Sequence, residues 1–500
     1  MKQFSFLFLF INALVFAQAN VSYDTSFGSN GRVFPLSTTP VLDNELSNFK
    51  SVQNIDNKII ATSSNVAISR YNLAGTLDTT FGTSGTTTVT TNSSYRIQDL
   101  GVLSDGSILV LINNAGFSSS VRKYKQDGSL DSTFGTSGSL SLFINSYSTK
   151  FNRLFVQSDD TVFLGGIAET YNSSTVTVAG IIKIDKNGNY DTSFSLDGKH
   201  TVSAPGTTYD FYGLDVDSSK NVYFGFGATV GSAYTVHVQK LSPNGNIISS
   251  FGTNGIASYT ATGIVGSDLK VFPNGKILLS SRYNAGLSAD LCLVVFNPAG
   301  ILDTSIGTGI FKYDIDNNSY DGLKRILIID NNSFYLAGMI QTGGSQYGLV
   351  LKFNSNFALD TNFNYSGIFT TYQTLNRWSS INEIFLQKDK KLLLTGAGEI
   401  TVNASLNNYV GLTRLTDTKL LATNESKKVN NVTIYPNPAS DFINVQSDKS
   451  IVGKSYEIVD MTGKSVMRNT FSAKEINVSS LTTGNYILKI DHESYKFIKK

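Results

Sequence analysis

One short motif recurs along the chain and restricts the folds that the chain can adopt. In its clearest copies, at residues 77–82 and 130–135, an aspartate is followed by two hydroxyl residues, a phenylalanine and a glycine. The phenylalanine, or the residue that replaces it, stands at positions 27, 81, 134, 194, 251, 306 and 363, in steps of 53 to 60 residues. A repeat of this length is typical of propellers, solenoids and related arrays.

Each period contains the same series of short strands and turns. Expected strands over 97–103, 107–112 and 119–124 are separated by a turn at Asp105-Gly106 and by a variable loop. Asp-Gly and Asn-Gly turns between alternating apolar runs are hairpin signals. With a fourth strand after the motif, each period predicts a four-stranded antiparallel meander, the blade of a β-propeller.

The two ends of the repeat array are expected to close on each other. Seven sets of the first three strands are present, the last over about 381–415, but polar residues follow from Thr418 instead of a fourth strand. A strand-like run over 32–36 precedes the first set. A closed ring leaves no open sheet edge. The sequence therefore predicts an all-β, seven-bladed β-propeller over residues 20–415, whose N-terminal strand completes the last blade.

The motif itself is interpreted as structural, because a site used once would not need so many copies. Its aspartate can accept a hydrogen bond from the backbone two residues on, its phenylalanine can lie between blades, and its glycine can adopt positive φ. The pattern Leu-Asp-x-x-Phe-Gly-x-x-Gly resembles the delta-60 repeat family, predicted β-propellers of bacterial secreted proteins. The resemblance covers about residues 23–415, departs at Ser195, Ser249, Ile306 and Asn364, and implies a fold but no common activity.

Residues 1–19 read as a secretory signal peptide. Lys2 supplies a positive charge, residues 4–16 are mostly apolar, and Ala17-Gln18-Ala19 is a cleavage site of the A-x-A type. No later stretch approaches the length of about 20 apolar residues that spans a bilayer. We therefore expect a mature chain without a transmembrane segment, secreted or held at the outer-membrane surface after cleavage near Ala19.

The C-terminal part differs from the repeats. Residues 416–431 are mostly polar and are expected to be a linker, and the short alternating strands of residues 432–500 predict a small Ig-like β-sandwich. The series of motifs in this part closely resembles the type IX sorting domain of Bacteroidota, at Tyr435, Pro436, Asn437, Pro438, Gly463, Gly484, Tyr486, Lys499 and Lys500. The resemblance implies passage across the outer membrane with the type IX secretion machinery as partner.

Composition restricts the chemistry. The net charge is +2, from 40 basic and 38 acidic residues, so nucleic acid is not an expected partner. Cys292 is the single cysteine and is expected to be buried, and of the three histidines His200 and His237 are expected to be structural, while His492 lies in the sorting module. Residues 314–321 carry the oxygen ligands that Ca²⁺ prefers, but Ser319 replaces the glycine of an EF-hand loop, so an ordinary loop is favoured. No catalytic residue, metal site or cofactor is assigned.

One set of positions is a candidate binding surface. Aligned on the turn after the first strand, the blades place Asp99, Arg153, Gly213, Asp268, Arg325 and Glu383 at one position, with Lys50 or Phe49 in the first blade. Nearby aromatic residues are Tyr95, Tyr147, Tyr209, Tyr320 and Trp378. We hypothesise that both groups surround one mouth of the central channel and bind carbohydrate or peptide. In the alternative interpretation the aromatics cover the blade tops and the charges pair with each other.

These observations favour a non-catalytic binding or adhesion module of the cell surface, with a glycan, matrix or surface protein as ligand. One alternative is a propeller enzyme acting on polysaccharide, which needs a pair of carboxylates in a cleft. Another is a structural subunit of a surface assembly, which would expose a large apolar patch.

Overall fold

The computed structural model describes residues 20–37, 49–92, 94–114, 118–144, 148–170, 176–202, 209–230, 233–285, 288–315, 320–371, 379–402, 405–421, 433–447, 450–461, 463–490 and 493–500. The predicted signal peptide and most of the predicted linker lie outside these ranges. The chain divides into two compact units, Met1–Leu421 and Ala422–Lys500, and each is described by itself.

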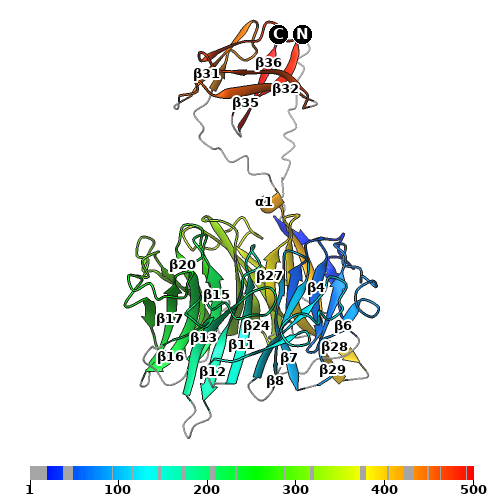
Figure 1. Cartoon of the computed structure of the whole chain (residues 1–500), viewed down its shortest axis with the longest axis vertical. Coiled ribbons are helices and arrows are strands. Elements are labelled where there is room, and N and C mark those ends of the chain that lie inside the picture. The colour runs from blue at the N-terminus through cyan, green and yellow to red at the C-terminus, as the bar shows by residue number, and fades with distance from the viewer. Residues whose placement is uncertain are drawn as a thin grey trace, which may run out of the picture. The chain divides into compact units, whose positions relative to one another are not determined.

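Four-stranded antiparallel meanders make up most of the first unit (Figure 1). The first two are β3 (Ser51–Gln53), β4 (Ile59–Ser64), β5 (Ala67–Tyr71) and β6 (Thr86–Thr88), then β7 (Tyr95–Val102), β8 (Ile108–Asn114), β9 (Ser118–Tyr124) and β10 (Ser139–Leu142). The next two are β11 (Ser148–Val156), β12 (Val162–Thr170), β13 (Val176–Ile184) and β14 (Lys199–Thr201), then β15 (Tyr209–Val216), β16 (Val222–Val230), β17 (Ala233–Leu241) and β18 (Ile256–Thr260).

An eight-stranded sheet contains two further meanders. Its strands are β19 (Ile264–Val271), β20 (Ile277–Ala285), β21 (Ser288–Phe296) and β22 (Ile310–Tyr313), then β23 (Tyr320–Ile328), β24 (Ser333–Thr342), β25 (Ser345–Asn354) and β26 (Ile368–Thr371). A single parallel bridge between Ala289 and Tyr320 joins the two halves.

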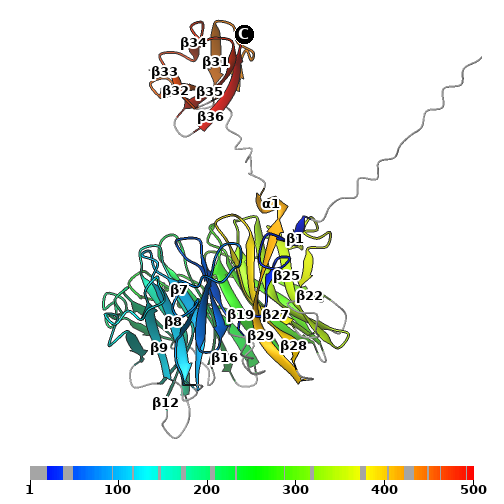
Figure 2. The same cartoon turned by 90° about the vertical axis from the view of Figure 1, so that its right-hand side faces the viewer.

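The last sheet of this unit contains strands from both ends of the repeat region. It consists of β27 (Ser379–Leu386), β28 (Leu392–Val402) and β29 (Ser405–Asp417) with β1 (Val21–Tyr23) and β2 (Arg32–Val33). Both N-terminal strands pair antiparallel with β29, with Tyr23 opposite Leu415 and Arg32 opposite Thr413 (Figure 2). The expectation that an N-terminal strand completes the last sheet is confirmed.

Apolar side chains fill every junction between consecutive sheets or meanders. Ile60 of the first meander shares a core cluster with Ile97 of the second, and equivalent clusters follow around the chain. The last junction brings Phe27 and Leu393 of the five-stranded sheet against Ile59 of the first meander. The sheets of the first unit therefore form a closed ring.

The repeated motif fastens one meander to the next. Oδ1 of Asp78 accepts hydrogen bonds from the backbone N–H and the hydroxyl of Thr80, at 3.2 and 2.7 Å. Phe81 is buried in the junction with the second meander. The amide of Gly82, with φ at +53°, donates to the carbonyl oxygen of Asp127 in that meander at 2.8 Å. The motif thus has the structural role expected of it.

The ordered chain continues beyond the predicted end of the repeats at residue 415. Strand β29 runs to Asp417, and a one-turn helix, α1 (Thr418–Leu421), follows. Asp417 is fully buried and accepts hydrogen bonds from Tyr335 Oη and Lys352 Nζ of the preceding meander, which explains the extension. Within the described ranges no helix is long and apolar enough to cross a membrane.

The second unit contains two sheets. One is β30 (Thr433–Tyr435), β31 (Phe442–Gln446) and β34 (Glu475–Asn477), and the other is β32 (Ser455–Asp460), β33 (Ser465–Thr470), β35 (Gly484–Ile490) and β36 (Glu493–Lys499). Ile443 and Ile476 from the first sheet share a core with Ile458 and Leu488 from the second. The unit therefore has its own hydrophobic core.

Candidate functional site

A β-bulge sets the direction of the predicted binding residues in six innermost strands, β7, β11, β15, β19, β23 and β27. The pairing register shifts immediately before Asp99 in β7 and before Arg153 in β11, and it does so again before Gly213, Asp268, Arg325 and Glu383. A bulge inserts one residue and re-aims the side chain beside it. The positions aligned in the sequence are therefore structurally equivalent.

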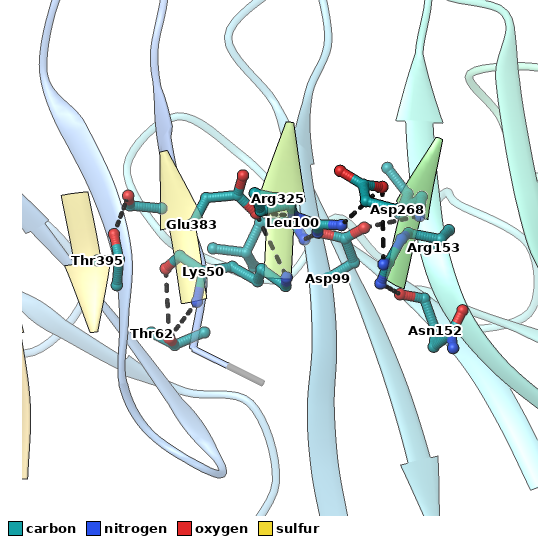
Figure 3. A network of polar contacts seen from close by, with 12 residues as sticks. Lys50, Thr62, Asp99, Leu100, Asn152, Arg153, Asp268, Arg325, Glu383 and Thr395 are labelled. Carbon is teal, nitrogen blue, oxygen red and sulfur yellow. Dashed lines mark hydrogen bonds and ion pairs between the residues drawn. The ribbon is translucent and has the colours of Figure 1, made fainter. Parts of the chain in front are cut away.

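The charged side chains at these positions meet at the centre of the ring (Figure 3). We call them the central charge cluster, which consists of Lys50, Asp99, Arg153, Asp268, Arg325 and Glu383. Arg325 Nε lies 2.8 Å from Oε2 of Glu383, which also lies 3.3 Å from Lys50 Nζ. Three cations and three carboxylates balance, so the cluster carries no net formal charge.

Arg325 is the hub of this cluster. Its guanidinium also lies 3.7 Å from Oδ1 of Asp268 and 4.0 Å from Oδ1 of Asp99, and Asp268 Oδ1 is 3.8 Å from Arg153 Nη2. Although burial opposes its charge, the three surrounding carboxylates raise the pKa of Arg325. One arginine thus connects carboxylates from three other meanders or sheets.

The aspartates of the cluster also bind the backbone of the following meander. Asp99 Oδ2 accepts from the N–H of Leu154 at 2.9 Å, and Asp268 Oδ2 accepts from the N–H of Ile326 at 2.9 Å. Each aspartate therefore joins two innermost strands while its other oxygen faces a cation. These hydrogen bonds and ion pairs join the innermost strands of different meanders at the centre of the ring.

Burial and neighbouring charges shift the ionisation of the other members. Burial and the charge of Arg325 lower the pKa of Lys50 to about 8, against the opposing effect of Glu383. The same two causes lower the pKa of Arg153 to about 10. Burial alone would raise the pKa of Glu383, but the charges of Arg325 and Lys50 hold it below its ordinary value.

Gly213 stands where the other innermost strands carry a charge. A Cβ atom at this position would lie 2.6 Å from the backbone nitrogen of Leu269 and 3.0 Å from Oδ1 of Asp268. Glycine is therefore needed here for the close approach of the neighbouring strand. Its absence of a side chain leaves Asp268 free to reach Arg153 and Arg325.

A cavity of about 280 Å³ adjoins the cluster at the centre of the ring. Five of the six clustered side chains line it, and Leu154, Phe155, Leu327 and Phe385 supply part of its apolar wall. The cavity thus combines fixed, paired charges with apolar surface. Such an arrangement is suited to binding a small polar group by hydrogen bonds at defined positions.

The predicted aromatic residues do not join the charges as one described surface. Tyr209 is 4% exposed and packs in the core between the third and fourth meanders, beside Phe226. Burial raises its pKa. Tyr95 is half-buried against the core between the first two meanders. Tyr147 and Trp378, and the side chain of Tyr320, lie outside the described part of the chain.

The other predicted structural residues lie inside the sheets. Nε2 of His200 is 2.9 Å from Oε1 of Gln239, and burial lowers the pKa of this histidine. His237 stacks on Phe226, and burial lowers its pKa to about 4. Cys292 is fully buried in β21, and burial raises the pKa of its thiol. His492 lies outside the described residues.

The oxygen-rich segment 314–321 is described only in part, since residues 316–319 fall outside the described ranges. Asp321 is buried in β23, and its Oδ2 accepts a hydrogen bond from the N–H of Ile315. In the described part of the chain, no group of three or more histidine, cysteine or acidic side chains is arranged to hold a metal ion.

Hydrogen bonds hold the segment around Asn437 against the end of the last strand of the second unit. Oδ1 of Asn437 accepts from the N–H of Ile498 at 2.9 Å, and the N–H of Lys500 donates to the carbonyl oxygen of Ala439 at 2.8 Å. Tyr486 is buried, and its hydroxyl donates to the carbonyl oxygen of Thr482 at 2.8 Å. Gly463, with φ at +87°, lies in the turn that joins β32 to β33.

The remaining motif residues divide between exposed and buried positions. Pro436, Pro438 and Tyr435 are exposed, Gly484 begins β35, and Lys499 is mostly buried at the end of β36. The segment around the two prolines therefore follows the edge of β36, and the chain's last residues are held in the sheet.

Sequence reasoning left the first member of the charge cluster open between Lys50 and Phe49. The structure places Lys50 in the cluster and Phe49 in an apolar core. It also adds Asn152, whose Nδ2 donates to the carbonyl oxygen of Phe211 in the next meander at 3.2 Å. Asn152 lies in the bulge of β11, directly before Arg153, so the alignment of the blades on their turns also identifies its position.

Two family models match parts of the chain. The secretion system C-terminal sorting domain matches residues 433–500, and the β-propeller domain of unknown function DUF5122 matches residues 56–81. No curated protein sequence is significantly similar to the chain.

Solved structures with low identity were also found. They include PorZ, a surface component of the type-IX secretion system of Porphyromonas gingivalis (TM-score 0.33, 10% identity, 96% of this chain and 53% of that chain). Others are the polysaccharide lyase Uly1 (0.45, 11%, 75% and 90%) and Drosophila Semaphorin 2a (0.42, 8%, 91% and 96%).

The chain spans about half the length of the PorZ structure. With TM-scores below 0.5, none of these three likenesses carries an argument about this chain. The family models instead confirm both resemblances seen in the sequence. The chain carries a DUF5122 β-propeller repeat and ends in a secretion system C-terminal sorting domain.

Proposed function

We propose that the protein is an exported, seven-bladed β-propeller that acts at the cell surface as a non-catalytic binding module. Each four-stranded meander and the five-stranded sheet count as one blade, and the single bridge at Ala289 does not merge its two neighbours. The propeller domain covers residues 20–421, and residues 432–500 form a small Ig-like sandwich.

The signal-peptide pattern and the sorting domain together support a route of export. Residues 1–19 act as a cleaved signal peptide, and the sorting domain directs the chain through the type IX secretion machinery. The protein is then released or held on the outer-membrane surface of a Bacteroidota cell. Its ligand is a surface glycan, a matrix component or a surface protein.

The central charge cluster carries the proposal of a binding role. Glu383 has a lowered pKa between Arg325 and Lys50, so it stays ionised at neutral pH and is unsuited to donate a proton. Asp99 and Asp268 are occupied by backbone N–H groups and arginines. General acid–base catalysis needs a group that changes its protonation during the reaction. Lys50 has a pKa of about 8, but it does not line the cavity. The paired charges that do line the cavity, beside an apolar wall, favour recognition instead.

The test is a combined binding and turnover screen with the purified full-length chain. Acidic and neutral polysaccharides are titrated by calorimetry, and new reducing ends or unsaturated products are measured in the same samples. Binding without product supports the proposal, whereas product formation would favour the polysaccharide-active enzyme. Binding of none of the polysaccharides would contradict a glycan ligand.

A matched pair of variants locates the site. Arg153 is the more exposed arginine of the cluster, with 17% of its side chain accessible, so Arg153→Gln should weaken binding by about tenfold. Lys220→Gln removes a surface cation paired with Asp159 and should leave binding unchanged. Equal affinities of both variants and the unaltered chain would exclude the cluster as the contact site.

A further inference from the structure

Five junctions of the ring share one arrangement of phenylalanine and glycine. The motif phenylalanine of one sheet lies against a turn glycine of the next, so closely that a Cβ atom on the glycine would approach its ring to 2.9–3.0 Å. The pairs are Phe27 with Gly75, Phe81 with Gly128, Phe134 with Gly188, Phe194 with Gly245, and Phe251 with Gly300. The phenylalanine therefore requires glycine opposite it.

At the junction between the two meanders of the eight-stranded sheet, the large and the small residue of this pair are exchanged. Ile306 stands at the phenylalanine position and Phe357 at the glycine position. Phe357 adopts φ of +58°, is 3% exposed, and stacks on Phe311 with ring centroids 5.1 Å apart. A bulky residue with positive φ is strained, and such strain gathers at functional sites.

The exchange also changes the backbone of this junction. In the other five, the residue after the motif aromatic donates its N–H to the carbonyl of the turn residue before glycine, for example Ser195 to Asn244 at 2.9 Å. Gly307 and Asn356, both within the described ranges, do not form the corresponding bond.

A pocket of about 250 Å³ lies at this junction. It is lined by Phe272, Asn274, Lys276, Ile306, Asn331, Asn332, Phe334, Asn354, Ser355, Asn356 and Phe357. It lies apart from the central cavity, with which it shares no lining residue.

The polar wall of this pocket consists mainly of carboxamides. Oδ1 of Asn274 accepts from the N–H of Lys276 at 3.1 Å, and Oδ1 of Asn354 accepts from the N–H of Asn356 at 2.9 Å. Oδ1 of Asn331 accepts from the N–H of Asn274 at 2.9 Å. With these Oδ1 atoms already accepting hydrogen bonds, the Nδ2 groups are the donors that the same side chains carry. The wall therefore offers donors to an acceptor-rich ligand.

A positive charge and an apolar floor complete the site. Lys276 lies in the wall, partly exposed, with its Nζ 2.6 Å from Oδ2 of Asp303. The lining includes no acidic side chain, and Ile306 is half-buried beside the phenylalanines. A carboxylate matches the donors, and the apolar side of a sugar ring matches the partly exposed Ile306. The volume is below that of pockets for drug-sized ligands and is suited to one sugar unit.

We propose that this pocket binds a single acidic sugar unit, with its carboxylate toward Lys276 and the asparagine amides. The site is separate from the central cavity and does not depend on the ligand proposed there.

The test titrates the purified full-length chain with glucuronic and galacturonic acid, and with glucose as the uncharged control, by calorimetry and ligand-observed NMR. We expect a uronic acid to bind and glucose to bind at least about tenfold more weakly. Absence of uronic acid binding, or equal binding of glucose, would overturn the proposal.

Two variants place the ligand at this junction. Asn356→Ala should weaken binding by about tenfold, whereas Asn244→Ala, the same turn position at a junction with the usual pair, should leave it unchanged. The double exchange Ile306→Phe with Phe357→Gly restores the common pair and should abolish binding while keeping the circular dichroism spectrum. Undiminished binding in Asn356→Ala and in the double exchange would overturn the assignment.

Discussion

Arg414 Nε lies 2.6 Å from Oδ2 of Asp24, and this ion pair joins the two ends of the repeat region. The same contact occurs within the first meander, where Arg70 Nε lies 2.6 Å from Oδ2 of Asp78. The guanidinium of Arg414 also lies over the ring of Phe27, 4.7 Å from its centroid. The N-terminal copy of the motif therefore packs on β29 as the copy at Asp78 packs on the third strand of its own meander. The ring is closed by the same type of ion pair that occurs within that meander.

Loss of the closing ion pair should destabilise the first unit. Asp24→Asn removes the carboxylate 2.6 Å from Arg414 Nε, and leaves this guanidinium, which is 3% exposed, with the carboxylate of Asp389 at 3.9 Å. Because breaking a buried ion pair leaves a buried charge less well compensated, we expect the free energy of unfolding to fall by about 3 kcal/mol. Urea denaturation measures this change.

The control for this variant is Asp191→Asn. Asp191 is the same motif residue paired with Lys183, but 29% of its side chain is exposed. A pair with this exposure contributes less than about 1 kcal/mol. Equal losses in the two variants would show that burial at the closure has no special effect.

Asp417 should stabilise the C-terminal end of the first unit. Asp417→Asn, or a chain that ends at residue 415, removes the buried partner of Lys352 and Tyr335. We expect a loss of about 3 kcal/mol relative to a chain that ends at residue 421. Thermal unfolding of the three chains measures it, and unchanged unfolding temperatures would contradict the role given to Asp417.

Acid should destabilise the first unit through His237. Its pKa is about 4 in the folded protein, lowered from 6.5 by burial, so between these values the unfolded chain binds more protons. Stability is then fully present above pH 6.5 and falls as the pH drops toward 4, by up to about 3 kcal/mol. Asp24, with a pKa of about 2, acts only at lower pH.

The check is the pH dependence of urea unfolding in the unaltered chain and in His237→Gln. The variant should lose most of the slope between pH 6.5 and 4, while His200, whose pKa is also lowered, retains a contribution of the same sign. An identical slope in both proteins would contradict a neutral, buried His237.

A side chain at Gly213 should disturb the central charge cluster. In Gly213→Ala the Cβ meets the backbone of Leu269 and Oδ1 of Asp268 at 3.0 Å or less, so the strands must move apart. Overpacking of this kind costs about 1–3 kcal/mol. Gly484→Ala, whose Cβ meets nothing nearer than 3.7 Å, is the control and should change stability by less than about 0.5 kcal/mol. Equal effects would contradict the close approach.

Local chemistry made much of the fold predictable. An Asp-Gly turn, an alternating strand and the hydrogen bonds of Asp78 to Thr80 depend on residues a few positions apart, so the repeat alone indicated the meanders. The missing last strand and the strand-like run over 32–36 predicted that an N-terminal strand completes the last sheet, and Arg32 pairs there with Thr413. The strength of these signals comes from their repetition along one chain.

The sites depended on contacts between residues far apart in sequence. The aligned positions of Arg325 and Glu383 were visible in the sequence, but their pairing at 2.8 Å follows from the bulges and from closure of the ring. The sequence left open whether Tyr209 lies at the channel mouth or covers a blade top, and in the structure it is buried in the core between the third and fourth meanders.

The sequence by itself therefore determined the repeat unit, the role of its motif and the order of the two units. Tertiary structure decided which charges neutralise each other and where Phe357 replaces a glycine. The physical reason is that hydrogen bonds within a turn require only neighbouring residues, whereas ion pairing and junction packing are set by distances that exist only after the sheets have closed into a ring.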